Sequence, residues 1–135
     1  MTRVVTELKP GFVKLGAMDA LEIRSAETRN GARALYLNGP LTLNTLFEFQ
    51  DVVRQEPSKG LIIVLEGVPY MDSAGLGAVL GAYASCQRHG QKFALAKVSQ
   101  RVRTLLQVAK VDTLVPSYDS LEAAETHVSA NAGSA

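Results

Sequence analysis

The sequence holds one cysteine, two histidines and no tryptophan in its 135 residues. The single cysteine, Cys86, excludes a disulfide within the chain, and one cysteine with two histidines disfavours a zinc cage. The sequence also lacks a run of about 18 apolar residues, the minimum for a transmembrane helix. These absences exclude an internal disulfide and predict no transmembrane helix, which leaves a domain that must be held together by its hydrophobic core.

Charge of either sign is not in excess. The chain has 14 Lys and Arg against 13 Asp and Glu, for a net charge of +1. This balance predicts no bulk attraction to nucleic acid or to an anionic membrane, and the length fits a single domain. Arg3, Glu7, Lys9 and Lys14 would interrupt the apolar core of a signal peptide. We therefore expect a cytoplasmic location.

Motifs for nucleotide binding and hydrolysis are missing. Gly75, Gly77 and Gly81 have G-x-G-x-x-x-G spacing, which is not the dinucleotide fingerprint, and no acidic residue follows before Asp112 to hold a ribose. A Walker A sequence does not occur, and the frame 71–75 (MDSAG) lacks the first glycine of a nucleophile elbow. The sequence therefore predicts a protein without catalytic activity or cofactor. Gly77 and Gly81 are interpreted as places where a helix closely approaches its sheet or a neighbouring helix.

Hydrophobic periodicity predicts strands alternating with helices. Alternation from Leu21, then Asn30-Gly31, then the segment 32–38 indicates an antiparallel hairpin with a type I′ turn. The unbroken apolar run 61–65 (LIIVL) indicates a strand buried on both faces. Further strands are expected over 92–98 and 114–118, and helices over 43–56, 74–89, from Ser99 to about Lys110, and over 120–128. The segment 3–8 is compatible with a further short strand.

This element order predicts one α/β domain with a mixed β-sheet, an N-terminal antiparallel hairpin followed by β-α units, and about four helices. We expect the domain to span residues 21–128, with 1–20 as an N-terminal extension and 129–135 as a disordered tail. Thr45 and Glu48 have the spacing of a capping box, and Ser99 and Ser120 stand where they would cap the last two helices.

Asp72 and Ser73 lie between the apolar strand and the helix expected from Ala74. Either side chain can accept hydrogen bonds from the free N–H groups of the helix, and both lie at the positive end of its dipole. A serine at such a position is most often a structural cap. The alternative is a hydroxyl that is available for chemistry.

Six basic residues and no acidic residue lie between Ser73 and Val111. Such a run is usually a solvated face. The alternative is a docking surface for an acidic protein partner, to which Arg101 and Arg103 would contribute. Direct binding of nucleic acid is disfavoured by the balanced charge.

The block 68–77 (VPYMDSAGLG) resembles the signature of the STAS domain, as found in bacterial anti-sigma factor antagonists. The similarity spans about residues 20–128, and its most specific part is Asp-Ser-x-Gly-Leu-Gly. The resemblance implies that Ser73, preceded by Asp72, is phosphorylated by an anti-sigma factor that is also a serine kinase. The unphosphorylated antagonist would bind that factor and free the sigma factor. The expected contact residues are Asp72, Ser73, Ala74, Gly75, Leu76, Arg101 and Arg103.

The chain departs from the family pattern at two places. Ala74 stands where the family often has a second serine, which leaves Ser73 as the single acceptor, and the segment 39–42 (GPLT) lacks a usual acidic residue. Similar domains also occur in anion transporters, lipid-transfer machinery and stressosome-type scaffolds, so an accessory or scaffold role is the alternative. The intact Asp-Ser pair favours the antagonist. We expect a monomer or weak dimer that contacts neither nucleic acid nor membrane.

Overall fold

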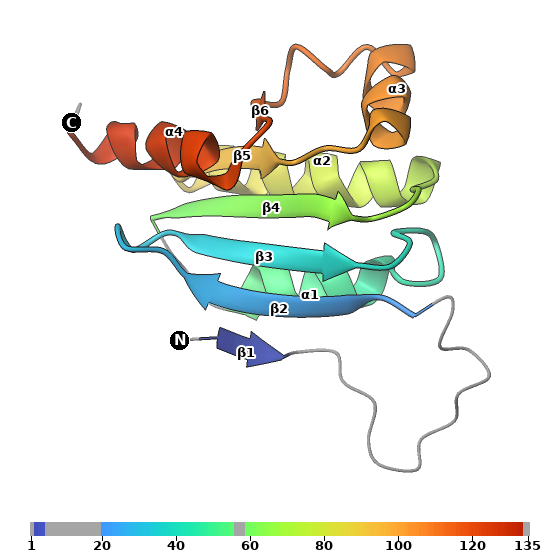
Figure 1. Cartoon of the computed structure of the whole chain (residues 1–135), viewed down its shortest axis with the longest axis horizontal. Helices are drawn as coiled ribbons and strands as arrows, with labels where there is room; N and C mark the ends of the chain where they lie inside the picture. Colours follow the sequence, from blue (N-terminus) through green and yellow to red (C-terminus); the bar gives the residue numbers. More distant parts are fainter. Residues whose placement is uncertain (1, 5–19, 56–58, 134–135) are drawn as a thin grey trace.

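The computed structural model describes residues 2–4, 20–55 and 59–133. In this part of the chain six strands form one sheet, and four helices pack on it (Figure 1). The strands are β1 (Thr2–Val4), β2 (Glu22–Glu27), β3 (Arg33–Asn38), β4 (Gly60–Gly67), β5 (Lys92–Ala96) and β6 (Ser117–Tyr118). The helices are α1 (Leu46–Gln55), α2 (Ser73–Arg88), α3 (Gln100–Val108) and α4 (Leu121–Gly133).

The strands follow one another across the sheet in chain order. β1, β2 and β3 are antiparallel neighbours, whereas β3, β4, β5 and β6 are parallel. The predicted mixed α/β sheet with an N-terminal hairpin is therefore confirmed. Helices α1, α2 and α3 each connect two parallel strands, so the loops that lead into them all leave from the same edge of the sheet. That edge carries the candidate site.

Strand β4 is buried on both faces, as its unbroken apolar run predicts. Leu61, Ile63 and Leu65 belong to the larger core, which includes the buried faces of α1, α2 and α3. Ile62 and Val64 face the other way and pack with alanines of β3 and β5 and with Ala124 and Val128 of α4. In Figure 1, α1 and α2 accordingly lie behind the sheet.

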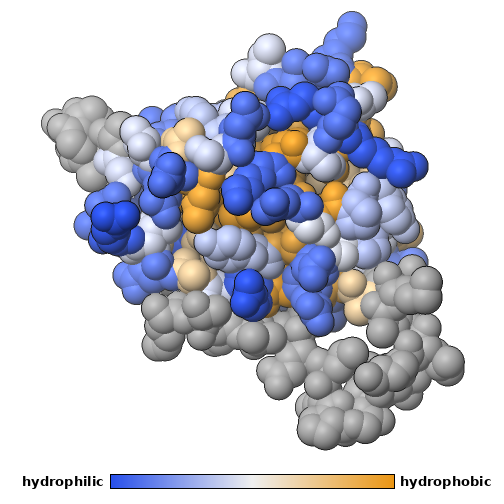
Figure 2. Space-filling model, in the orientation of Figure 1, coloured by the Kyte–Doolittle hydropathy of each residue, from blue (hydrophilic) through white to orange (hydrophobic). Residues whose placement is uncertain are grey.

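The face that carries α4 is only partly covered. Figure 2 shows hydrophobic surface near the middle of this face with hydrophilic side chains around it. A hollow of about 470 Å³ lies over β2, β3 and β4, and Arg24, Tyr36, Val64 and Glu66 are among its lining residues. The Arg24 guanidinium carbon stands 5.9 Å from the centre of the Tyr36 ring, so a cation–π contact occupies part of the open face.

The hairpin turn differs from the predicted type I′ turn. Gly31 has φ of 87°, but Asn30 does not have a positive φ, which a type I′ turn needs at both central positions. The Gly31 N–H donates to the Thr28 carbonyl at 3.2 Å, and the Thr28 N–H donates to the Ala32 carbonyl at 2.7 Å. The connection is thus a three-residue loop, a type I turn followed by one left-handed glycine.

The predicted capping box of the first helix is wrong. Thr45 Oγ1 accepts from the Thr42 N–H and donates to the Pro40 carbonyl, both at 2.9 Å, and Thr45 is buried. Its hydroxyl therefore closes the loop before α1, and the helix begins at Leu46, three residues later than expected. The predicted end at Glu56, before Pro57, lies outside the described residues.

Other element ends also shift. Helix α4 is capped by Ser120, whose Oγ accepts from the Ala123 N–H at 3.0 Å, but it runs to Gly133 and so extends into the segment expected to be a tail. Residues 129–132 contain neither glycine nor proline, so nothing in them stops the helix. β5 ends at Ala96 because Lys97 has φ of 56°. β1 starts one residue earlier than the strand considered over 3–8, and the remainder of that segment lies outside the described residues.

Candidate functional site

Two loops lie side by side at the carboxyl edge of the parallel strands. One follows β3 and leads into α1, and the other follows β4 and leads into α2. Leu41 and Met71 form a parallel bridge between them. The Leu41 N–H donates to the Tyr70 carbonyl at 3.2 Å, and the Asp72 N–H donates to the Leu41 carbonyl at 3.3 Å. The start of α2 is thus held to the β3–α1 loop by backbone hydrogen bonds.

Asp72 is the N-cap of α2 and also joins the two loops. Its backbone is extended (φ −100°, ψ −174°), and its Oδ1 accepts from the Gly75 N–H at 2.8 Å. Its Oδ2 accepts from the Leu43 N–H at 3.2 Å. The hydrogen bond from Gly75, with a smaller contribution from Leu43, lowers the pKa of Asp72 below its ordinary value. The carboxylate is therefore charged at neutral pH and already occupies donors that an incoming anion would use.

Ser73 is the first residue of α2, and its side chain is exposed. Within the described part of the chain its hydroxyl has no hydrogen-bond partner. The interpretation of Ser73 as a structural cap is therefore wrong, because Asp72 fills that position. Ser73 therefore retains an exposed hydroxyl in the first turn of α2 that makes no hydrogen bond within the described residues.

Gly75 is the glycine that the site requires. A Cβ at this position would lie 2.0 Å from the Leu41 carbonyl oxygen, which is far inside contact distance. By contrast, a Cβ at Gly77 or Gly81 would meet nothing within 4 Å. The interpretation of those two glycines as close-approach positions is wrong. The close approach occurs at Gly75, and it is to a loop.

The five motif residues expected at a partner interface differ in exposure. Asp72 and Ser73 are exposed, Ala74 is half-buried, and Gly75 and Leu76 are buried. Only the first three therefore present surface to a partner. Gly75 and Leu76 instead set the position of the others, Gly75 through the Leu41 loop and Leu76 as part of the core.

Exposed apolar side chains stand on the same two loops and on the first turn of α1, and none of the sequence patterns described above indicates them. Leu43 is 61% exposed, Phe47 is 65% exposed and Tyr70 is 43% exposed. Phe47 could have been found, because it lies off the buried helical face that contains Leu46 and Phe49. Tyr70 and Leu43 lie in loops, where no periodicity distinguishes an exposed apolar residue from a buried one.

Helix α3 starts at the same edge of the sheet. Ser99 is its cap, as predicted, and Ser99 Oγ accepts from the Val102 N–H at 3.3 Å. Arg101 is exposed, whereas an Arg103 Nη atom lies 3.4 Å from Asp119. Lys97 likewise reaches Glu66 at 3.4 Å.

The run of six basic residues between Ser73 and Val111, which contains no acidic residue, does not form one continuous basic surface. Lys92 begins β5 and Lys97 follows its last residue, so these two lysines lie at opposite edges of the sheet. Two of the six basic residues, Lys97 and Arg103, also pair with acidic residues that lie outside this run. Lys97 and Arg101 are the two members of the run that stand exposed at the edge that carries Ser73, and Lys97 is paired with Glu66.

The single cysteine, Cys86, is poorly placed for chemistry because it is buried. Burial raises the pKa of the Cys86 thiol to about 11, so the thiol stays protonated at neutral pH and little of the nucleophilic thiolate is present. Among residues 2–4, 20–55 and 59–133, no three His, Cys, Asp or Glu side chains gather as metal ligands would. Over the same ranges, no helix is both long and apolar enough to cross a bilayer.

The family model of the STAS domain matches residues 24–124 of the chain. The chain belongs to the STAS domain family. The match runs from within β2 to the first turn of α4 and includes the Asp72–Ser73 site, so the resemblance inferred from residues 68–77 is confirmed.

Similar STAS proteins carry antagonist names. The chain is 26% identical over 98 residues to the anti-sigma F factor antagonist of Paenibacillus polymyxa, and the aligned region covers 70% of this chain and 84% of that protein. It is 28% identical over 82 residues to the anti-sigma-B factor antagonist of Staphylococcus aureus, which covers 58% and 76%.

Solved structures confirm the fold. An anti-sigma factor antagonist from Mycobacterium paratuberculosis superposes with a TM-score of 0.74 at 18% identity, covering 82% of this chain and 95% of that one. SpoIIAA, an anti-sigma factor antagonist solved in its unphosphorylated form, gives 0.66 at 20% identity, covering 78% and 95%. A sulfate transporter family protein from Wolinella succinogenes gives 0.63 at 20% identity, covering 80% and 92%.

Proposed function

We propose that this STAS domain is an anti-sigma factor antagonist that binds an anti-sigma factor with serine kinase activity. It binds while Ser73 is unmodified, and phosphorylation of Ser73 releases it. The observation that carries this proposal is the free, exposed hydroxyl of Ser73, which remains because Asp72 caps the helix. The names of the similar proteins support the partner class. The protein itself catalyses no reaction in this proposal and acts in the cytoplasm, where sigma factors are found.

The switch follows from charge at the start of α2. A phosphate adds about −1.5 to −2 charges at neutral pH. A helix N-terminus normally attracts such a group, but here the Asp72 carboxylate already accepts from Gly75 and Leu43. The phosphate would therefore meet an adjacent negative charge at a site where donors are already used. Because Ser73 is exposed, the fold tolerates the group, and the cost falls on any partner that covers it.

The partner surface combines apolar and charged groups. Leu43, Phe47 and Tyr70 expose apolar area on the loops around Ser73, and Arg101 stands exposed at the start of α3. Arg103, which lies near Asp119, would contribute at the rim. A partner that desolvates this edge must also desolvate Ser73. If a phosphate there costs about 3 kcal/mol, affinity falls on the order of a hundredfold.

The test uses the unmodified chain and the Ser73→Ala and Ser73→Asp variants. The chain is incubated with an anti-sigma factor kinase of its own organism and ATP, and the phosphate is mapped by mass spectrometry. We expect modification at Ser73, constitutive binding by Ser73→Ala and about a hundredfold weaker binding by Ser73→Asp. Gln87→Glu, which adds one negative charge on the exposed surface near the other end of α2, should bind like the unmodified chain.

Two results would overturn the switch. One is phosphate mapped to a residue other than Ser73, and the other is equal affinity of the alanine and aspartate variants. Capture of an ABC-type ATPase in place of a kinase would favour the accessory role in a membrane system.

A further inference from the structure

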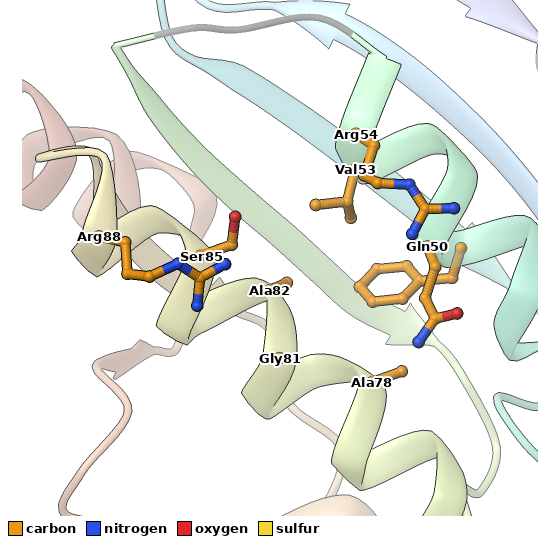
Figure 3. A pocket seen from close by; sticks show the side chains of 9 residues that line it. Gln50, Val53, Arg54, Ala78, Gly81, Ala82, Ser85 and Arg88 are labelled. Carbon is orange, nitrogen blue, oxygen red and sulfur yellow. The ribbon is translucent and has the colours of Figure 1, made fainter.

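A groove separates α1 from α2 on the face of the sheet opposite α4. It has a volume of about 210 Å³. Phe49 and Val53 of α1 and Ala78 and Ala82 of α2 form its apolar lining. Figure 3 looks into this groove and shows the two helices as its walls. The site is separate from the Ser73 edge, which lies at the beginning of α2.

The groove exists because α2 presents small residues to α1. Ala78, Gly81, Ala82 and Ser85 recur at helical spacing along this wall. At Gly81 a Cβ would meet nothing within 4 Å, so the glycine leaves space open and does not serve close packing. A volume of 210 Å³ corresponds to roughly seven water-sized groups at about 30 Å³ each.

The polar groups at the groove favour an anion. Arg54 and Gln50 stand on the α1 wall, and Arg88 and Ser85 stand on the α2 wall (Figure 3). None of the lining residues is acidic. Arg54 pairs with Asp51 of its own helix at 2.9 Å, but both side chains are largely exposed, so this pair is weak.

Arg88 has no acidic partner among the described residues. An apolar floor between two guanidinium groups matches a molecule with one acidic head and a short apolar body. Guanidinium recognises carboxylate and phosphate by the same paired N–H donors.

We propose that the α1–α2 groove binds a small organic anion, a carboxylate or phosphate monoester with an apolar chain of about six to eight carbons. The head group pairs with Arg88 and Arg54, while the chain lies over Phe49 and Val53 beside Gly81. This proposal stands independently of the phosphorylation of Ser73.

The test titrates octanoate and octyl phosphate into the full chain and follows backbone amide resonances by NMR. We expect saturable shifts confined to the groove-lining residues of α1 and α2, and the tighter of the two probes identifies the head group. 1-Octanol, which has the same chain without the charge, should bind at least tenfold more weakly. Equal binding of the alcohol would show that the arginines do not recognise an anion and would overturn the proposal.

Matched variants test whether the anion binds in the α1–α2 groove. Gly81→Leu fills the groove and should weaken binding at least tenfold, whereas Gly77→Leu adds the same side chain to open space outside the groove and should bind like the unmodified chain. Arg88→Gln should weaken octanoate but not octanol, whereas Arg29→Gln, at an exposed turn, should change neither. Thermal melting checks that each variant is folded. Undiminished octanoate binding by Gly81→Leu, or the absence of saturable shifts, would rule out the groove.

Discussion

Helices α2 and α3 start at the same edge of the sheet, and each has a serine at its start, but only one of the two serines caps its helix. At α3, Ser99 is the cap, and its hydroxyl accepts from the Val102 N–H. At α2, Asp72 is the cap, and Ser73 follows it with an exposed hydroxyl. A shift of one position therefore separates a serine whose hydroxyl caps a helix from a serine whose hydroxyl is exposed and makes no hydrogen bond within the described residues.

The third residue after each cap differs as well. At α3 it is Val102, which is buried in the core with its full side chain. At α2 it is Gly75, against which the Leu41 carbonyl packs so closely that no Cβ fits. The start of α3 is therefore held by its own side chain, whereas the start of α2 is held by a neighbouring loop.

The largest effect is expected from making α2 resemble α3 at this position. Gly75→Val places a branched side chain where the Leu41 carbonyl lies, so the loop and the helix must separate. We expect the free energy of unfolding to fall by about 3 kcal/mol in urea denaturation. Gly77→Ala is the control and should stabilise the protein by up to about 1 kcal/mol, because its Cβ meets open space in a helix. Equal effects of the two variants would show that Gly75 is not a contact position.

The same comparison shows what the sequence can predict. The two-sided burial of β4 follows from a run without polar alternation, and the capping by Ser99 and Ser120 follows from serines placed before amphipathic segments. These features depend on neighbouring residues alone. The location of Asp72 and Ser73 at a strand-to-helix turn was predicted for the same reason.

The remaining features depend on contacts between distant residues. Whether Asp72 or Ser73 caps α2 is decided by backbone angles and by the Leu43 N–H, which lies 29 residues away in the chain. The need for glycine at position 75 arises from a carbonyl of another loop. Exposure of Leu43 and Tyr70 likewise depends on how the two loops meet. Local patterns contain none of this information.

Removing the caps tests the division of roles between the serines. Asp72→Ala loses the bonds to Gly75 and Leu43 and should cost about 1 to 2 kcal/mol of unfolding free energy. Ser99→Ala should cost about 1 kcal/mol. Ser73→Ala should change stability by less than about 0.5 kcal/mol, because it removes no bond. Chemical denaturation of all three variants measures these differences, and a loss at Ser73 equal to that at Ser99 would contradict the assignment.

A smaller effect is expected from pH. The pKa of Asp72 is lower in the folded protein than in the unfolded chain, where it is about 3.9. The stability that the charged form contributes is therefore complete above that value and is lost as the pH falls through the folded-state pKa. Asp72→Asn retains a capping oxygen that does not titrate. The unfolding free energy of the unmodified chain should fall relative to that of Asp72→Asn as the pH decreases from 5 to about 3, and parallel profiles would contradict the assignment.

The smallest effect on stability concerns the charge at the start of α3. Arg101 lies in the first turn, where a cation opposes the helix dipole, and no acidic residue balances it there. Arg101→Glu should therefore stabilise the protein by about 0.3 to 1 kcal/mol. If Arg101 contacts an acidic partner, the same change should slow association, most strongly at low salt. Arg29→Glu reverses another exposed charge, at the hairpin turn, and should leave association unchanged. Surface plasmon resonance at two salt concentrations, together with thermal melting, separates the two effects. A variant that is more stable and also binds more slowly identifies a residue retained for binding at the expense of stability, whereas unchanged association would leave Arg101 as part of a solvated face.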